Sequence, residues 1–256
     1  MLSEEIIIIA IFCAIATVLG MMDYKHSQGK LYLSEILLCG VLFALRGSSF
    51  RRFYVWLTRR NLFDLPDRTR LQRLLITHQK QCHQFLEDPT VLNITDSFGV
   101  EVIHPFREGR SSQSQRISKK GKSNHRWIIG RKINVIINQN LSVVQYQNDT
   151  ANICDKNFNP ALAKTPGIIL ADNGYRDREG IPENMKICQK GSWNCRMYVE
   201  TLFSLWERIC NAKRSFHRTV LGFTAKTAFL VALTNIAFSL NESFGFNRFS
   251  LVQWAL

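Results

Sequence analysis

Apolar residues recur along the chain with two different periods, and these periods predict where helices and strands lie. Steps of three and four residues predict helices over 34–45, 50–60, 68–85, 152–163, 196–212 and 218–240. Alternating or short continuous apolar runs predict strands over 91–103, 127–137, 141–147 and 168–171. We therefore expect an N-terminal helical module over residues 1–90, a mixed α/β sheet flanked by helices over 91–240, and a tail over 241–256.

The longest apolar run, Ile6–Met22, raises the question of a membrane span. Its length lies at the bottom of the range of about 17–25 residues that transmembrane helices need. Ser3 and the two acids after it are typical of the start of a helix and differ from the basic start of a signal peptide. We favour a buried helix in a cytoplasmic protein over a membrane anchor, and the anchor is the alternative.

Three acidic residues stand where different elements could bring their carboxylates together. Asp96 and Asp172 each follow apolar, strand-like residues, and Gly174 marks a turn directly after the second acid. Glu200 lies at the border of an apolar helical stripe made by Val199, Leu202, Phe203, Trp206 and Cys210. Carboxylates from separate elements are the ligands that divalent metal ions use, so these three acids form a candidate metal site.

The order of these motifs resembles that of the DDE transposases of bacterial insertion sequences. The residues that carry the resemblance are Asp96, Gly130-Arg131-Lys132, Ala171-Asp172-Asn173-Gly174-Tyr175 and Arg196-x-x-x-Glu200. The resemblance covers about residues 34–240 and implies a ribonuclease-H-like catalytic domain. It also implies binding to the terminal inverted repeats of an element, metal-dependent DNA cleavage, and strand transfer into target double-stranded DNA by a homodimer that pairs two ends.

The resemblance assigns a role to each residue of the candidate site. Asp96 would bridge two Mg²⁺ or Mn²⁺ ions, Asp172 would hold one of them, and Glu200 would hold the other. Two such ions, about 3.5–4 Å apart, activate the attacking oxygen and stabilise the leaving oxygen. Arg196 would orient the scissile phosphate. Trp193 lies where relatives carry an aromatic residue that stacks on DNA bases, and burial at a domain edge is the alternative for it.

The charge of the chain independently favours a polyanionic partner. The sequence has 33 Lys and Arg residues against 20 Asp and Glu residues, a net charge of +13. Between residues 104 and 132 nine basic residues accompany Glu108 alone, and we interpret this segment as a mobile basic loop that binds DNA. The nine are Arg107, Arg110, Arg116, Lys119, Lys120, Lys122, Arg126, Arg131 and Lys132.

Two features leave alternatives to an active transposase open. Some relatives have a Lys directly after the second Asp and another seven residues after the Glu, whereas this chain has Asn173 and Glu207. An inactive copy of the enzyme is therefore one alternative. A structure-selective DNA nuclease on the same fold and a non-enzymatic, membrane-anchored basic protein are the others. The seven cysteines include no Cys-x-x-Cys pair, which argues against a zinc ribbon and favours a reduced, cytoplasmic protein.

Overall fold

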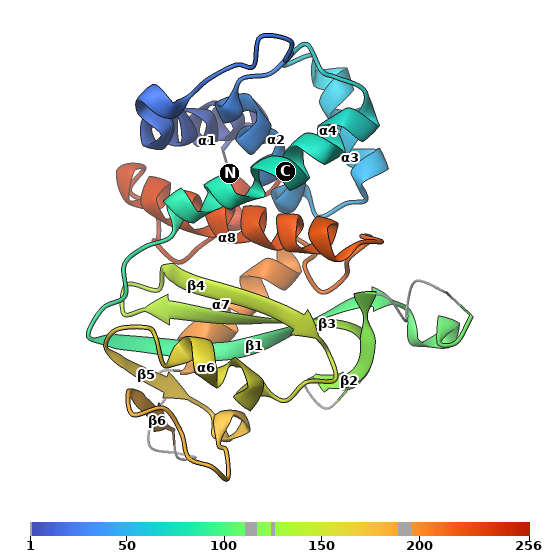
Figure 1. The fold of residues 1–256 in the computed structure, drawn as a ribbon. Helices are drawn as coiled ribbons and strands as arrows, with labels where there is room; N and C mark the ends of the chain where they lie inside the picture. Colours follow the sequence, from blue (N-terminus) through green and yellow to red (C-terminus); the bar gives the residue numbers. More distant parts are fainter. Residues whose placement is uncertain (1, 111–116, 124–125, 189–195) are drawn as a thin grey trace. The chain divides into compact units, whose positions relative to one another are not determined.

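A computed structural model describes residues 2–110, 117–123, 126–188 and 196–256 of the chain (Figure 1). The chain divides into two units. Unit 1 comprises Met1–Phe85, Leu205–Ala212 and Val220–Leu256, and unit 2 comprises Leu86–Ser204 and Lys213–Thr219.

Unit 2 is built on a mixed sheet whose two central strands, β1 and β3, run antiparallel. β5 and β6 continue the sheet beyond β1 in parallel, while β2 and β4 pair with successive parts of the other edge of β3. The strand order is β2-β3-β1-β5-β6, with β4 also on β3. The strands are β1 (Leu92–Ile103), β2 (Lys119–Ser123), β3 (Arg126–Asn138), β4 (Val143–Thr150), β5 (Ile168–Ala171) and β6 (Met185–Ile187).

The two faces of this sheet are covered by different segments of unit 2, because side chains alternate between faces along each strand. One face carries Ile136, Ile169 and Ala171, which pack with Tyr175 in one apolar cluster. The other face carries Phe98, whose ring centroid lies 5.0 Å from that of Phe203 in α7. Figure 1 shows α6 in front of the sheet and α7 behind it. The covering elements are η4 (Asp155–Phe158), α6 (Asn159–Leu162), η5 (Asn173–Tyr175) and the part of α7 (Arg196–Arg208) up to Ser204, while η3 (Pro105–Arg107) follows β1.

The sheet confirms the predicted strands and adds two that the sequence pattern did not predict. β2 lies inside the segment predicted as a mobile basic loop, and β6 lies in a segment with no predicted element. Both are short strands at which backbone pairing with a neighbour, rather than an apolar run, decides the conformation. The predicted crossover helix over 152–163 is replaced by η4 and the single turn of α6.

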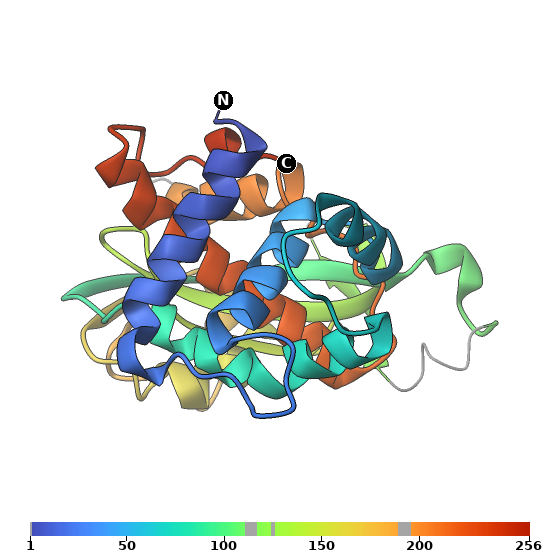
Figure 2. The same ribbon diagram turned by 90° about the horizontal axis from the view of Figure 1, so that it is seen from above.

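Unit 1 is a bundle of helices around α2, which is buried at every position from Leu33 to Leu45 except Glu35. Figure 2 shows α1 and α2 above α8, and both helices contact it. A Cβ atom on Gly40 would lie 2.2 Å from the ring of Phe229, so the absence of a side chain allows α2 and α8 to approach this closely. The helices are α1 (Glu4–Leu19), η1 (Gly20–Met22), α2 (Leu33–Arg46), α3 (Phe50–Arg60), α4 (Arg68–His78), η2 (Gln79–Phe85), α8 (Val220–Ser243) and η6 (Val252–Trp254).

Two helices are long and apolar enough to cross a membrane by length and composition alone, Glu4–Met22 and Val220–Ser243. The second corresponds to the helix predicted over 218–240, and 83% of its most apolar window is buried. Only 28% of the corresponding window of the first is buried. Ile7, Ile11 and Ile15 pack inside unit 1, whereas Ile9 is exposed. One face of α1 therefore belongs to the core of unit 1 and the other face is exposed.

The predicted domains divide the chain after residues 90 and 240, and the two units divide it after Phe85, Ser204, Ala212 and Thr219. The predicted boundary after residue 90 lies close to the division between Phe85 and Leu86. Val220–Ser243, predicted as part of the α/β region, belongs to unit 1 because it packs with α1, α2 and η2. The predicted tail also belongs to unit 1, where the buried Trp254 donates its indole N–H to the Asn241 amide oxygen at 2.8 Å.

Candidate active site

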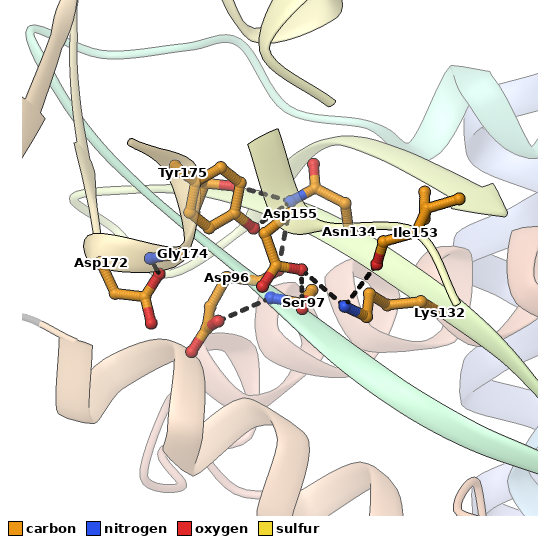
Figure 3. Close-up of polar contacts among 10 residues, drawn as sticks. Asp96, Ser97, Lys132, Asn134, Ile153, Asp155, Asp172, Gly174 and Tyr175 are labelled. Atoms are coloured by element: carbon orange, nitrogen blue, oxygen red, sulfur yellow. Dashed lines mark hydrogen bonds and ion pairs between the residues drawn. The ribbon is translucent and has the colours of Figure 1, made fainter. Parts of the chain in front are cut away.

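Asp96 lies within β1, and Asp172 directly follows the neighbouring parallel strand β5. Ile94 of β1 pairs with Leu170 of β5, and each aspartate comes two residues later along the chain. Two residues is the side-chain period of a strand, and Asp172 keeps an extended backbone with φ −86° and ψ 179°. Both carboxylates therefore point to the face opposite the one that carries Ala171, as Figure 3 shows.

Each of the two carboxylates accepts a hydrogen bond from a nearby backbone N–H. The Asp172 carboxylate accepts the Gly174 N–H at 2.8 Å, so this side chain also starts the η5 turn. The Asp96 carboxylate accepts the N–H of Ser97 at 2.7 Å. Both carboxylates are thus held on one face of the sheet, where oxygen atoms from the two side chains can serve as ligands for a divalent cation.

Glu200 lies on α7, the helix that packs on the same face. Val199, Leu202, Phe203 and Trp206 are buried as the apolar stripe predicts, and Glu200 is exposed beside this stripe. The contact between Phe98 and Phe203 places this part of α7 on the Asp96 face. Arg196 is the first residue of α7, one turn before Glu200.

The pKa of the buried Tyr175 phenol shows that Asp155 also lies close to Asp96 and Asp172. Burial and then the charges of Asp96, Asp155 and Asp172 raise the pKa of the Tyr175 phenol well above its ordinary value. The hydroxyl of Tyr175 accepts the side-chain N–H of buried Asn134 at 2.6 Å. Three carboxylates therefore lie within electrostatic reach of one hydroxyl at this end of the sheet.

Asp155 reaches the site from the face opposite to Asp96 and is held by an ion pair. Its carboxylate accepts the Lys132 ammonium at 3.0 Å and the Ser97 hydroxyl at 2.6 Å (Figure 3). The Lys132 ammonium also donates to the carbonyl oxygen of Ile153 at 3.0 Å. Because Ser97 follows Asp96 directly on β1, this network fixes the backbone that carries the first carboxylate of the candidate site.

The sequence pattern assigned Lys132 to DNA binding and gave Asp155 no role, although a signal for the pairing of these two residues was present. Lys132 and Asn134 interrupt an otherwise apolar central strand, where polar groups need buried partners. Asp155 is such a partner. Its place next to Lys132 could be found only from the tertiary structure, because 22 residues of strand and turn separate the two along the chain.

The predicted DNA-binding residues fall into two groups in the part of the chain that the structure describes. Arg131 and Lys132 are buried: Arg131 donates to the Ile117 carbonyl and to Asn148, and Lys132 pairs with Asp155. These two side chains stabilise unit 2 and do not face solvent, which corrects their assignment to DNA contact. Arg116 and Trp193 lie outside the described residues. The exposed residues are Arg107, Arg110, Lys119, Lys120, Lys122 and Arg126.

The carboxylate groups have the chemistry that a hard divalent cation requires. Oxygen ligands are those that Mg²⁺ prefers, and Asp96 and Asp172 offer carboxylate oxygens from one face of the sheet. Among the described residues, no three His, Cys, Asp or Glu side chains are arranged to hold a metal ion together. The strand pairing brings Asp96 and Asp172 to the same face of the sheet, and Glu200 lies on the helix that packs on that face.

A mixed sheet flanked by helices, with Asp96 within β1, Asp172 directly after the parallel strand β5 and Glu200 on a covering helix, is the arrangement of the ribonuclease-H-like class of α/β domains. Residues 86–227, more than half of the chain, match the family described as the transposase DDE domain, and the chain belongs to this family. Comparisons with curated proteins and with solved structures gave no match. The fold class predicted from the sequence and the resemblance to DDE transposases are confirmed.

Proposed function

We propose that this protein is a DNA transposase in which Asp96, Asp172 and Glu200 hold two Mg²⁺ or Mn²⁺ ions. The observation that carries the proposal is that β1 and the end of its neighbour β5 bring Asp96 and Asp172 to one face of the sheet, on which the helix of Glu200 packs. The protein would bind the terminal inverted repeats of its element, cut there, and join the ends to target DNA. We further propose that it acts in the cytoplasm as a homodimer, because transposition pairs two ends.

The side chains of unit 2 support this chemistry in distinct ways. Metal ions bound by the three acids would activate the attacking oxygen and stabilise the leaving oxygen of the phosphodiester. Asp96 and Asp172 start from neighbouring strands, so they can share one cation with little rearrangement. Glu200 closes the ligand set from the helix, and Arg196, one turn earlier, orients the phosphate. The pair of Lys132 with Asp155 keeps β1 rigid behind the first carboxylate.

DNA binding would rest on basic side chains of both units. In unit 2 these are the exposed residues between 107 and 126. In unit 1 the α3 helix presents Arg51, Arg52 and Arg59 to solvent while it buries Phe53 and Leu57. Guanidinium groups on an exposed helix face are suited to phosphate contacts, so the helical unit would bind duplex outside the catalytic domain.

The test is Mg²⁺-dependent cleavage of a duplex that carries the element's own ends, with binding measured on the same duplex. Asp96→Asn, Asp172→Asn and Glu200→Gln should each lower the cleavage rate by about a hundredfold or more while end binding persists. Glu183→Gln, at an exposed acid of unit 2 away from the site elements, serves as the matched control and should cut normally. Calorimetric titration with Mn²⁺ should show weakened binding in the three variants alone.

The outcomes separate the proposal from its rivals. Unchanged cleavage in Asp172→Asn would refute the site assignment. Equal affinity for inverted-repeat and scrambled duplexes, together with cleavage, would favour a structure-selective nuclease on the same fold. End binding without cleavage by the wild type would indicate an inactive copy that retains its DNA-binding surface.

A further inference from the structure

Exposed aromatic rings stand among the exposed cations of unit 2. Trp127 is 58% exposed and Phe106 is 75% exposed. Trp127 lies directly opposite Lys122 in the antiparallel pair of β2 and β3. We call this surface the aromatic–basic ribbon, and its residues are Phe106, Arg107, Arg110, Lys119, Lys120, Lys122, Arg126 and Trp127.

The ribbon is one continuous surface rather than scattered side chains. The Lys120 ammonium lies 5.8 Å from the centre of the Trp127 ring and also pairs with Glu108 at 2.8 Å. That pair ties β2 to the segment after η3, where Arg110 lies 5.1 Å from the centre of the Phe106 ring. Aromatic and cationic groups therefore alternate from η3 to the far end of the strand pair.

The backbone of the ribbon is anchored on unit 2, so its side chains are presented from a fixed base. Gly121 of β2 is buried, and a Cβ atom there would lie 1.8 Å from the Ala151 carbonyl oxygen. Arg126 pairs at 3.0 Å with Glu101, a largely buried acid of β1. Its neighbour Trp127, by contrast, projects a large ring into solvent, although Trp is highly buried on average in folded proteins.

The charges of the ribbon fit a phosphate backbone. Within the described residues, Arg107, Arg110, Lys119 and Lys122 take part in no ion pair. The pair between Lys120 and Glu108 is exposed on both sides, so a phosphate group can replace the carboxylate at little cost. Six cations facing one exposed acid favour an anionic polymer over an apolar protein partner.

The aromatic rings decide which form of DNA fits. A paired and stacked base offers its face to neighbouring bases only, whereas an unpaired base can stack on an exposed Trp or Phe ring. Phosphate contacts alone would not require a bare indole ring beside two lysines. We propose that the aromatic–basic ribbon binds an unpaired stretch of DNA, with Trp127 and Phe106 stacking on bases and the neighbouring cations contacting phosphates. This inference rests on the proposed function, because it assumes that the protein acts on DNA.

The experiment compares two fluorescently labelled probes in metal-free buffer with the full-length chain. One probe is a blunt duplex, and the other is the same duplex with unpaired oligothymidine arms. The wild type should bind the forked probe about tenfold more tightly, as expected for one or two base–aromatic stacks. Trp127→Ala should remove this preference and leave blunt-duplex affinity unchanged, while Trp127→Phe should keep most of it.

Matched variants separate stacking from charge. Lys122→Gln should weaken the binding of both probes by the same factor, because it removes a phosphate contact. Tyr24→Ala removes a half-exposed aromatic ring from unit 1 and should bind both probes as the wild type does. Oligothymidine should quench the tryptophan fluorescence of the wild type more than that of Trp127→Phe, which tests stacking even if Trp127→Ala folds poorly.

Each result decides the inference. Equal affinity of the wild type for both probes would overturn the single-strand assignment and leave the proposed function intact. Equal weakening of both probes by Trp127→Ala would assign the ribbon to duplex DNA instead. Equal quenching in the wild type and Trp127→Phe would show that no base stacks on this ring. Absence of binding to either probe would overturn the proposed function itself.

Discussion

The ion pair between Lys132 and Asp155 provides the sharpest test of how the site is supported. The side chains are 9% and 22% exposed, and the ammonium and carboxylate groups are 3.0 Å apart. At this distance and an effective dielectric constant of about 20, two unit charges attract by about 5 kcal/mol before desolvation is subtracted. Asp155→Asn would leave the ammonium buried without a countercharge, and Lys132→Met would leave the carboxylate unpaired.

The expected losses follow from burial. Removing one partner of a fully buried pair costs about 3–5 kcal/mol, and the partial exposure of Asp155 reduces this. We expect Asp155→Asn to lower the free energy of unfolding by about 3 kcal/mol and Lys132→Met by about 2 kcal/mol. The double variant should lose about 2 kcal/mol less than the sum, since the two side chains share one interaction.

Urea denaturation followed by both tryptophan fluorescence and far-ultraviolet circular dichroism measures these losses, and coincident transitions show whether a two-state analysis applies. Lys120→Met, at the exposed ion pair with Glu108 in the same unit, is the matched control and should change stability by less than about 1 kcal/mol. Single-variant losses that add within about 0.5 kcal/mol in the double variant would refute the coupling.

Three further predictions concern unit 1. Burial lowers the pKa of the Lys226 ammonium to about 8. Below pH 8 the folded state therefore holds a buried charge that lowers the free energy of unfolding, and this destabilisation decreases as the pH rises from 8 to about 10.4, the pKa of an unperturbed lysine. Lys226→Met should therefore raise the unfolding free energy by about 3 kcal/mol at pH 7, with the gain shrinking through that window in urea titrations. Gly40→Ala should cost about 1–3 kcal/mol by overpacking against Phe229, and a smaller residue at 229 should recover part of the loss. Trp206→Phe removes the 2.8 Å hydrogen bond to Thr234 and should lower the melting temperature, whereas an unchanged value would show that this bond contributes nothing.

The carboxylate pair and its strands could be predicted from the sequence because their signals are local. The apolar residues of β5 end at Asp172, and the alternation of β1 places Asp96 beside buried residues. The apolar stripe of α7 likewise marks Glu200 at its border. A side-chain period of two or 3.6 residues specifies which face a residue occupies, whatever the rest of the fold does.

The long-range contacts of these elements could be determined only from the tertiary structure. Asp155 meets Lys132 because the fold brings η4 next to β3. Lys132 is therefore buried, whereas its charge had predicted an exposed side chain. Residues 119–123 form a strand because β3 offers a free edge, although their own sequence is that of a polar loop. Long-range pairing is the cause in both cases. A local pattern states what a segment must bury or pair, and only the folded chain determines which distant partner meets that need.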